Sequence, residues 1–155
     1  MRKGKKSFMK VFNRRAKYDY YLLEKFEAGI VLTGAEVKSV RENKIKLAES
    51  FVRLREDGAY LVNAHISPYR YARNQSYQPT RSRRLLLHKK QILSLMKKME
   101  GRGLALVPYS CYLKRNKIKL GIALARGKKK WDKREAVKKR DLKREAEREL
   151  RAYES

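Results

Sequence analysis

Apolar and β-branched residues near the start of the chain predict a strand followed by a short helix. Residues 18–26 are rich in aromatic residues and leucine, and the apolar residues 30–32 continue this pattern, as is typical of a strand. Thr33 and Glu36 then have the spacing of a capping box, in which the first residue caps a helix and the later one reaches back to it. We therefore expect a short helix that begins here and ends near Asn43.

A hairpin is predicted next. Residues 51–55 and 60–66 flank Glu56-Asp57-Gly58, and Asp-Gly between two such runs is a strong hairpin signal. Alternation points Val52 and Leu54 inward. On the second strand, alternation places four residues on one shared face: Tyr60, Val62, Ala64 and Ile66.

The second half of the chain combines an amphipathic helix with another hairpin. Four apolar residues recur at helical spacing before Gly101 and Gly103, either of which can end the helix: Ile92, Leu95, Met96 and Met99. Residues 104–113 and 117–125 are predicted strands joined across residues 114–116. In the later strand apolar residues alternate with Lys, Gly and Ala, so we expect one of its faces to lie in the core.

Several strands joined by short turns, with few helices between them, predict a mainly β fold. We expect a small antiparallel OB-like β-barrel with two or three α-helices packed outside it. The distribution of charge divides the chain further. Residues 1–16 are predicted to form a basic N-terminal arm, residues 17–126 the barrel domain, and residues 127–155 a basic C-terminal tail.

The tail has a different character from the rest. Leu142, Ala146 and Leu150 are spaced as one helical stripe, but this stripe is too narrow to fix a helix onto a core. Its Ala, Glu, Lys and Arg residues are nevertheless strong helix formers. We expect a tail that is disordered when free and helical when phosphates surround it.

Composition narrows the function. The chain has 155 residues, and 42 Lys and Arg against 16 Asp and Glu give it a formal net charge of +26. Such an excess destabilises a compact state unless an anionic partner neutralises it, so we predict a polyanion-binding protein. We expect no signal peptide, no membrane span and a reducing, cytoplasmic location, since no apolar run is long enough and Cys111 has no partner for an intramolecular disulfide.

Catalysis and metal binding find little support. No phosphate-binding loop, zinc-protease or nucleophile-elbow motif is present. His65 is predicted on the solvent face of its strand and His88 at a helix start, without a positioned partner, and Cys111 is expected to be inert. We predict no catalytic residues, no metal and no cofactor, although an RNA-modifying or RNA-cleaving enzyme stays open as an alternative.

A loop in the middle of the chain favours RNA as the polyanion. Residues 69–84 interleave Tyr69, Tyr71 and Tyr77 with five arginines, which are Arg70, Arg73, Arg81, Arg83 and Arg84. Aromatic rings among arginines suit unstacked bases and folded RNA loops better than a DNA groove. The alternative is a solvated loop whose tyrosines pack on the barrel. On composition alone, a ribosomal or ribosome-assembly protein that binds rRNA would also fit.

Four segments resemble the SmpB family, the small protein B that binds transfer-messenger RNA (tmRNA, or SsrA RNA). They are NRRAKY at residues 13–18, FEAGIVLTG and EVKS within 26–39, PTRSRRLLL at 79–87 and GKKKWDKR at 127–134. The resemblance implies a β-barrel that binds the tRNA-like domain of tmRNA. It also implies delivery, with elongation factor Tu, to bacterial ribosomes stalled on messages without a stop codon. The tail would then enter the empty mRNA channel near the decoding centre of 16S rRNA, and we expect a monomer.

The resemblance also suggests RNA contacts. Glu27 matches a family position used in RNA binding, and we expect it to accept hydrogen bonds from a base or 2′-OH or to orient a basic neighbour, unless it only holds the strand end. Leu86 matches another such position, with core packing as an equal alternative. Lys117 would contact a phosphate, unless it is simply solvated. The remaining expected contacts are Asn13, Arg14, Arg15, Lys17, Arg81, Arg83, Arg84 and His88.

A second group of residues is expected to engage the ribosome. It comprises Lys128, Lys129, Lys130, Trp131, Asp132, Lys133 and Arg134. Trp131 stands where the family often has His or another aromatic residue. Because an indole stacks on a base but cannot exchange the same proton, stacking is the role we expect for it.

Overall fold

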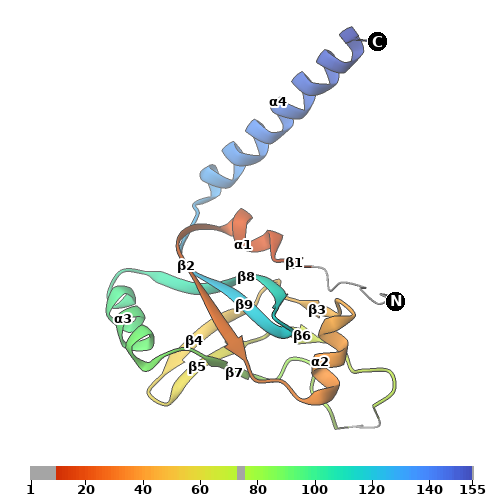
Figure 1. Ribbon diagram of the computed structural model, residues 1–155. Helices are drawn as coiled ribbons and strands as arrows, with labels where there is room; N and C mark the ends of the chain where they lie inside the picture. The colour runs from red at the N-terminus through yellow and green to blue at the C-terminus, as the bar shows by residue number, and fades with distance from the viewer. Residues whose placement is uncertain (1–9, 73–75, 155) are drawn as a thin grey trace.

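The computed structural model describes residues 10–72 and 76–154, so residues 1–9 of the predicted basic arm and Arg73 lie outside the described residues. Strands and helices follow one another along the described chain as shown in Figure 1. The elements are β1 (Val11–Phe12), α1 (Arg14–Asp19), β2 (Tyr20–Ile30), α2 (Gly34–Arg41), β3 (Ile45–Lys46), β4 (Phe51–Arg55), β5 (Gly58–Val62), β6 (His65–Ile66), β7 (Arg83–Leu86), α3 (Lys89–Met99), β8 (Leu104–Lys114), β9 (Lys117–Gly127) and α4 (Lys130–Glu154).

The main sheet is antiparallel and its pairings close on themselves. Its strand order is β1-β8-β4-β5-β7-β2-β9, and β8 also pairs with β9. Six strands therefore form a ring of pairs, to which β1 adds at the outer edge of β8, while β3 and β6 pair in a separate ribbon. This confirms the mainly β prediction, although the chain has four helices where two or three and a tail were expected.

Both predicted hairpins are present. Phe51 pairs with Val62 in the first, and Lys114 pairs with Lys117 in the second. Arg115 and Asn116 form the second turn with φ angles of 51° and 64°. This left-handed pair is what a two-residue turn needs to match the twist of the flanking strands.

The core lies inside the ring of strands. Leu61, Leu106, Leu120 and Ile122 are buried there together with Leu95 of α3. The helix predicted from the spacing of the apolar residues is thus confirmed, and it packs over one end of the sheet through its apolar face (Figure 1).

One face assignment in the first hairpin was wrong. Tyr60 and Val62 do not share a face with the buried Ala64 and Ile66, because β5 turns Ala59 and Leu61 into the core instead. Asn63 lies between these two sets with φ of 69°, and this left-handed residue reverses the alternation that a continuous strand would keep. The chain accordingly leaves the main sheet here, and Ile66 pairs with Ile45 in the ribbon.

The last strand has more than one buried face. Residues 120–125 are all buried, whereas alternation predicted a single core face. The reason is α1, an unpredicted helix whose Ala16 packs against Val107 and Ala125 in a second, smaller cluster. This cluster covers the end of β8 and β9 that the main core leaves open.

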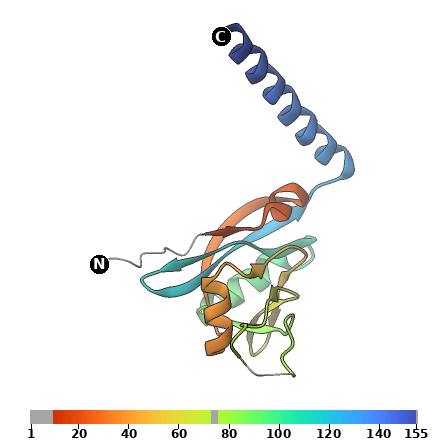
Figure 2. The same ribbon diagram turned by 90° about the vertical axis from the view of Figure 1, so that its right-hand side faces the viewer.

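The C-terminal tail is a helix that leaves the rest of the molecule. In Figures 1 and 2, α4 projects from the sheet beside α1 and packs along no other element. Its apolar residues Leu142 and Leu150 are exposed, which agrees with the narrow stripe seen in the sequence. The disorder expected for the free tail stays a prediction. No helix in the described parts of the chain is long and apolar enough to cross a membrane.

Candidate nucleic-acid interface

Strand register gathers three of the predicted RNA contacts on one outer face of the sheet. Leu86 pairs with Gly29, two residues from Glu27 on β2, and Gly29 in turn pairs with Lys119. Lys117 lies two residues from Lys119 on β9, and residues two apart on a strand point the same way. We call this surface the β2–β9 face. It consists of Lys10, Phe12, Lys25, Glu27, Gly29, Leu86, Tyr109, Tyr112, Lys114, Lys117, Lys119 and Gly121.

Glu27 sits at the middle of this face and already has partners within the protein. Its carboxylate accepts a hydrogen bond from the hydroxyl of Tyr112, and Lys114 Nζ lies 3.3 Å from its Oε1. The Tyr112 hydrogen bond and the nearby Lys114 and Lys119 charges lower the pKa of Glu27, although desolvation opposes them. Glu27 is therefore an anion among lysines, and it orients its neighbours as the sequence analysis allowed.

Aromatic rings on the face carry lysine side chains. Lys10 Nζ lies 5.3 Å from the ring centre of Phe12 and 5.2 Å from that of Tyr112. Lys25 Nζ lies 5.0 Å from the ring centre of Tyr109. Cation–π contacts of this kind hold the ammonium groups beside the rings without neutralising their charge. The face thus presents positive charge and exposed ring surface together.

Leu86 is exposed rather than buried, which settles the alternative of core packing against it. Its side chain is 57% accessible, whereas the preceding Leu85 is buried at 2%. Leu86 lies against Gly29, where an added Cβ would meet its Cδ1 at 3.2 Å. The two residues border a pocket of about 310 Å³ that Lys117 and Lys119 also line. An apolar contact for RNA is therefore set directly beside two cations.

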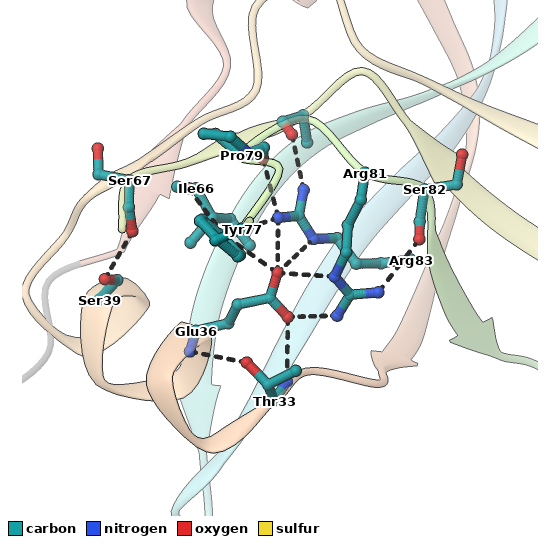
Figure 3. Close-up of polar contacts among 11 residues, drawn as sticks. Thr33, Glu36, Ser39, Ile66, Ser67, Tyr77, Pro79, Arg81, Ser82 and Arg83 are labelled. Carbon is teal, nitrogen blue, oxygen red and sulfur yellow. Dashed lines mark hydrogen bonds and ion pairs between the residues drawn. The ribbon is translucent and has the colours of Figure 1, made fainter. Parts of the chain in front are cut away.

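Arg81 and Arg83 belong to a buried ion cluster instead, shown in Figure 3. Glu36 is 1% exposed, and Arg83 places Nε at 3.0 Å and Nη2 at 2.6 Å from its Oε2. Arg81 donates to both carboxylate oxygens, with Nε 3.1 Å from Oε2. Burial alone would raise the pKa of Glu36, but hydrogen bonds from Arg81, the Thr33 backbone and Arg83 outweigh it and hold that pKa at about 2.

The same cluster ties the arginine-rich loop to the ribbon. Arg83 donates to the carbonyl oxygens of Ala64 at 2.8 Å and Pro79 at 2.9 Å, and Tyr77 donates to that of Ile66 at 2.9 Å. A fully buried guanidinium cannot reach RNA at the surface, so the expected direct contact is corrected for Arg83. Tyr77 likewise packs inward, which is the alternative that the sequence analysis kept open.

The expected N-terminal contacts divide in the same way. Asn13 is 6% exposed, and its Nδ2 donates to the carbonyl oxygens of Leu47 at 3.2 Å and Pro108 at 2.8 Å. Its Oδ1 accepts from the Ala16 N–H at 3.3 Å, so Asn13 caps α1 and this buried side chain is not placed to touch RNA. Arg14, Arg15 and Lys17 are exposed.

Arg84 and His88 lie away from the β2–β9 face. Arg84 Nη2 donates to the Asp57 carbonyl at 2.8 Å, and its guanidinium lies 6.0 Å from the ring centre of Tyr60. Both residues line a groove of about 620 Å³ between the β4–β5 hairpin and α3. His88 is exposed, and its backbone N–H donates to Gln91 Oε1 at 3.1 Å at the start of the helix.

The tail residues form a fixed root followed by a free helix. Lys133 Nζ lies 3.2 Å from Asp19 Oδ1, and the Lys128 N–H donates to the Asp19 carbonyl at 2.8 Å. Asp132 Oδ2 accepts from the Lys129 N–H at 3.2 Å, which caps α4. The other members, Lys130, Trp131 and Arg134, are exposed, and Trp131 is 62% accessible.

Several residues of the face escaped sequence reasoning. Lys119 shares the phase of Lys117, so alternation could have found it. Tyr112 pairs with Lys119 and was equally accessible to that argument. Tyr109 was not, because an irregularity in register between Pro108 and Ser110 sets its direction.

Other chemistry is sparse. Within residues 10–72 and 76–154, no group of three or more His, Cys, Asp or Glu side chains could hold a metal ion. Burial raises the pKa of the Cys111 thiol to about 12, so it stays protonated at neutral pH. His65 is half-buried rather than on the solvent face as expected.

Comparisons with known proteins agree with one another. Residues 10–152 match the family described as SmpB protein. An SsrA-binding protein of Sulfurihydrogenibium sp. (strain YO3AOP1) is 52% identical over 139 residues, covering 90% of this chain and 91% of the relative. An SsrA-binding protein of Trichodesmium erythraeum (strain IMS101) is 49% identical over 142 residues, covering 91% of each.

A solved structure is similar as well. It is described as "tmRNA-SmpB: a journey to the center of the bacterial ribosome", and one of its chains superposes with a TM-score of 0.66 at 43% sequence identity. The match covers 83% of this chain and 94% of that one.

Proposed function

The chain belongs to the SmpB family, and we propose from this that it is the tmRNA-binding adaptor of trans-translation, the rescue of stalled ribosomes through tmRNA. The observation that carries the proposal within this molecule is the β2–β9 face. It joins five lysines, three aromatic rings and an exposed leucine around one carboxylate. We propose that this face binds the tRNA-like domain of tmRNA, as an RNA-binding protein and not as an enzyme.

Each part of the face has a separate task in this proposal. The lysine side chains contact phosphates and supply affinity through the release of counterions. Leu86 packs against the sugar or base of a nucleotide, and Lys117 and Lys119 hold the adjoining phosphates. Arg14, Arg15 and Lys17 add contacts at the N-terminal side, while Arg84 and His88 stay proposed contacts on the neighbouring groove.

We further propose that α4 is the part that engages the ribosome. Its side chains are free of the barrel beyond the root, and its basic residues suit rRNA. The helix would enter the empty mRNA channel near the decoding centre, after delivery of the complex by elongation factor Tu in the bacterial cytoplasm. The protein would act there as a monomer.

A binding titration against the isolated tRNA-like domain, with an elongator tRNA as competitor, tests the proposal. Tight binding at physiological salt that the tRNA cannot displace is the expected result. Equal and weak binding to both RNAs would contradict it and would direct attention to rRNA as the partner.

Salt is expected to weaken this binding steeply. If the face neutralises about five phosphates, the affinity falls roughly a hundredfold or more between about 50 and 200 mM salt. Lys119→Gln should reduce the slope of log affinity against log salt by about one. Lys97→Gln, on the exposed side of α3 away from the face, serves as the matched control and should leave the slope unchanged. A nearly flat salt dependence in the unaltered protein contradicts electrostatic binding.

Trp131 gives a test of the tail. Trp131→Ala is expected to reduce tagging of stalled products more than Trp131→Phe, because a phenyl ring retains part of the stacking surface. Stacking on one base corresponds to roughly ten- to a hundredfold in affinity for the ribosome. Neither change should alter affinity for the tRNA-like domain. Equal losses in the two variants would exclude stacking as the role of this side chain.

A further inference from the structure

Two tyrosines on β8 are turned outward by features that core packing does not require. An added Cβ at Gly121 would lie 2.8 Å from Tyr109 Cζ and 2.7 Å from Ser110 Oγ, so the absence of a side chain there makes room for the Tyr109 ring. The register of β8 against β9 shifts between Pro108 and Ser110, beside Tyr109. Such irregularities re-aim a side chain at the cost of ladder hydrogen bonds. The chain gives up regular pairing and a side chain to place this ring.

Tyr112 is held by its hydroxyl rather than by its ring. The hydroxyl donates to the Glu27 carboxylate, which also lies 3.3 Å from Lys114 Nζ. The hydrogen bond fixes the edge of the ring and leaves its faces to solvent and to Lys10, whose Nζ is 5.2 Å from the ring centre. An exposed lysine–ring contact is weak, so a phosphate can draw the ammonium away and free the ring face.

The carboxylate at the centre of the face determines what can lie there. A phosphate directly over Glu27 would be repelled, whereas the surrounding lysines attract phosphates to the rim. A nucleotide that crosses the face with its phosphates at the rim brings its base over the rings. Only an unpaired base can do so, because a paired base has both faces covered within the helix.

We infer that Tyr109, Tyr112 and Phe12 form an aromatic shelf on which unpaired bases of the bound RNA stack, with Glu27 as the positioning residue that holds Tyr112. This inference rests on the proposed function, since it names the part of the tRNA-like domain that the β2–β9 face takes. Glu27 then acts through the Tyr112 ring and not by touching RNA itself.

Base removal in the RNA tests the shelf without altering the protein. Abasic sites are placed one at a time at the unpaired positions of the tRNA-like domain, and each RNA is titrated with the full-length protein. We expect one or two positions where loss of the base weakens binding roughly ten- to a hundredfold. With Tyr112→Leu or Tyr109→Leu, removal of the same base should cost little more, because the stacking partner has already gone.

Tyr60→Leu is the matched control. Tyr60 is also half-buried on a strand beside arginine side chains, but it lies on β5, which pairs with none of β2, β8 or β9. This variant should retain the full effect of base removal. If a tyrosine variant does not fold, 2-aminopurine at the sensitive position decides the matter. Its fluorescence should be quenched when the unaltered protein binds.

A double-mutant cycle isolates the part played by Glu27. Tyr112→Phe keeps the ring and removes the hydroxyl, so Glu27→Gln should cost little in that background if Glu27 acts through Tyr112. A full, additive loss from Glu27→Gln in the Tyr112→Phe protein would overturn the positioning role.

The outcomes separate the two levels of the argument. If the unaltered protein does not bind the tRNA-like domain selectively, the proposed function fails. If it binds selectively but no base removal is coupled to Tyr109 or Tyr112, only the aromatic shelf is overturned.

Discussion

Ending the chain after Gly127 is expected to abolish tagging of stalled translation products and to leave affinity for the tRNA-like domain within a few-fold of its original value. The β2–β9 face lies entirely before this point in the described chain. The side chains of α4 beyond its root face solvent and add no residue to that face. Binding and ribosome engagement should therefore separate cleanly at Gly127.

The experiment needs both readouts on the same protein. Tagging is measured in a reconstituted translation system programmed with a message that lacks a stop codon, and RNA affinity is measured by titration at the same salt. Trp131→Phe in the full-length chain controls for handling, because it leaves the charge of α4 intact. Tagging that survives truncation would refute the role given to the tail.

The root of α4 predicts how little the truncation should disturb the barrel. Asp19 accepts from Arg15 Nε at 3.0 Å and lies 3.2 Å from Lys133 Nζ. Desolvation raises the pKa of Asp19, but these two partners outweigh it and lower that pKa overall. After truncation Arg15 still pairs with this carboxylate, so only one partly exposed ion pair is lost, and such pairs contribute little to stability.

Local sequence signals predicted local structure well. The Thr33 and Glu36 spacing gave α2 and its capping box, with the Thr33 N–H donating to Glu36 Oε1 at 3.0 Å and the Glu36 N–H donating to Thr33 Oγ1 at 3.2 Å. The hairpins and the apolar face of α3 followed from turn chemistry and periodicity in the same way. In each of these cases the interacting residues are close in sequence.

Long-range partners were what the sequence could not supply. The same Glu36 that caps α2 also binds arginines 45 and 47 residues later, and no local pattern shows that pairing. Arg83 and Arg84 are adjacent in sequence, yet one is buried and the other exposed, because β7 points them to opposite sides. The family resemblance placed Glu27 and Leu86 correctly on a common face, but only strand register joined Tyr112 and Lys119 to them.

Glu36→Ala is expected to lower the free energy of unfolding by roughly 3–5 kcal/mol, because it leaves a buried guanidinium without its counter-charge. For a domain of this size the change corresponds to about 10–20 °C in melting temperature. Arg83 is fully buried and Glu36 is 1% exposed, so water cannot compensate for the missing partner. Glu24→Ala is the matched control. Glu24 pairs with Lys98 at 2.9 Å on the surface, and its loss should change the melting temperature far less.

Glu36 also predicts a pH dependence with a definite sign. Its pKa is about 2 in the folded protein against an ordinary value of 4.5, so ionised Glu36 stabilises the fold fully above pH 4.5. That contribution is lost progressively as the pH falls from 4.5 toward 2. Glu36→Gln removes the titrating group. The stability difference between the unaltered protein and this variant should therefore be roughly 2 kcal/mol smaller at about pH 3 than at about pH 7.

Urea unfolding at the two pH values measures this difference, and an equal gap at both would show that ionised Glu36 does not support the fold. The network also links stability to RNA binding. Arg83 begins β7, and the same strand carries Leu86 against Gly29 on the β2–β9 face. Loosening the Glu36 cluster should consequently weaken binding of the tRNA-like domain, although Glu36 is buried and does not belong to the face. Undiminished affinity in a folded Glu36→Gln protein would mean that β7 keeps its position without the cluster.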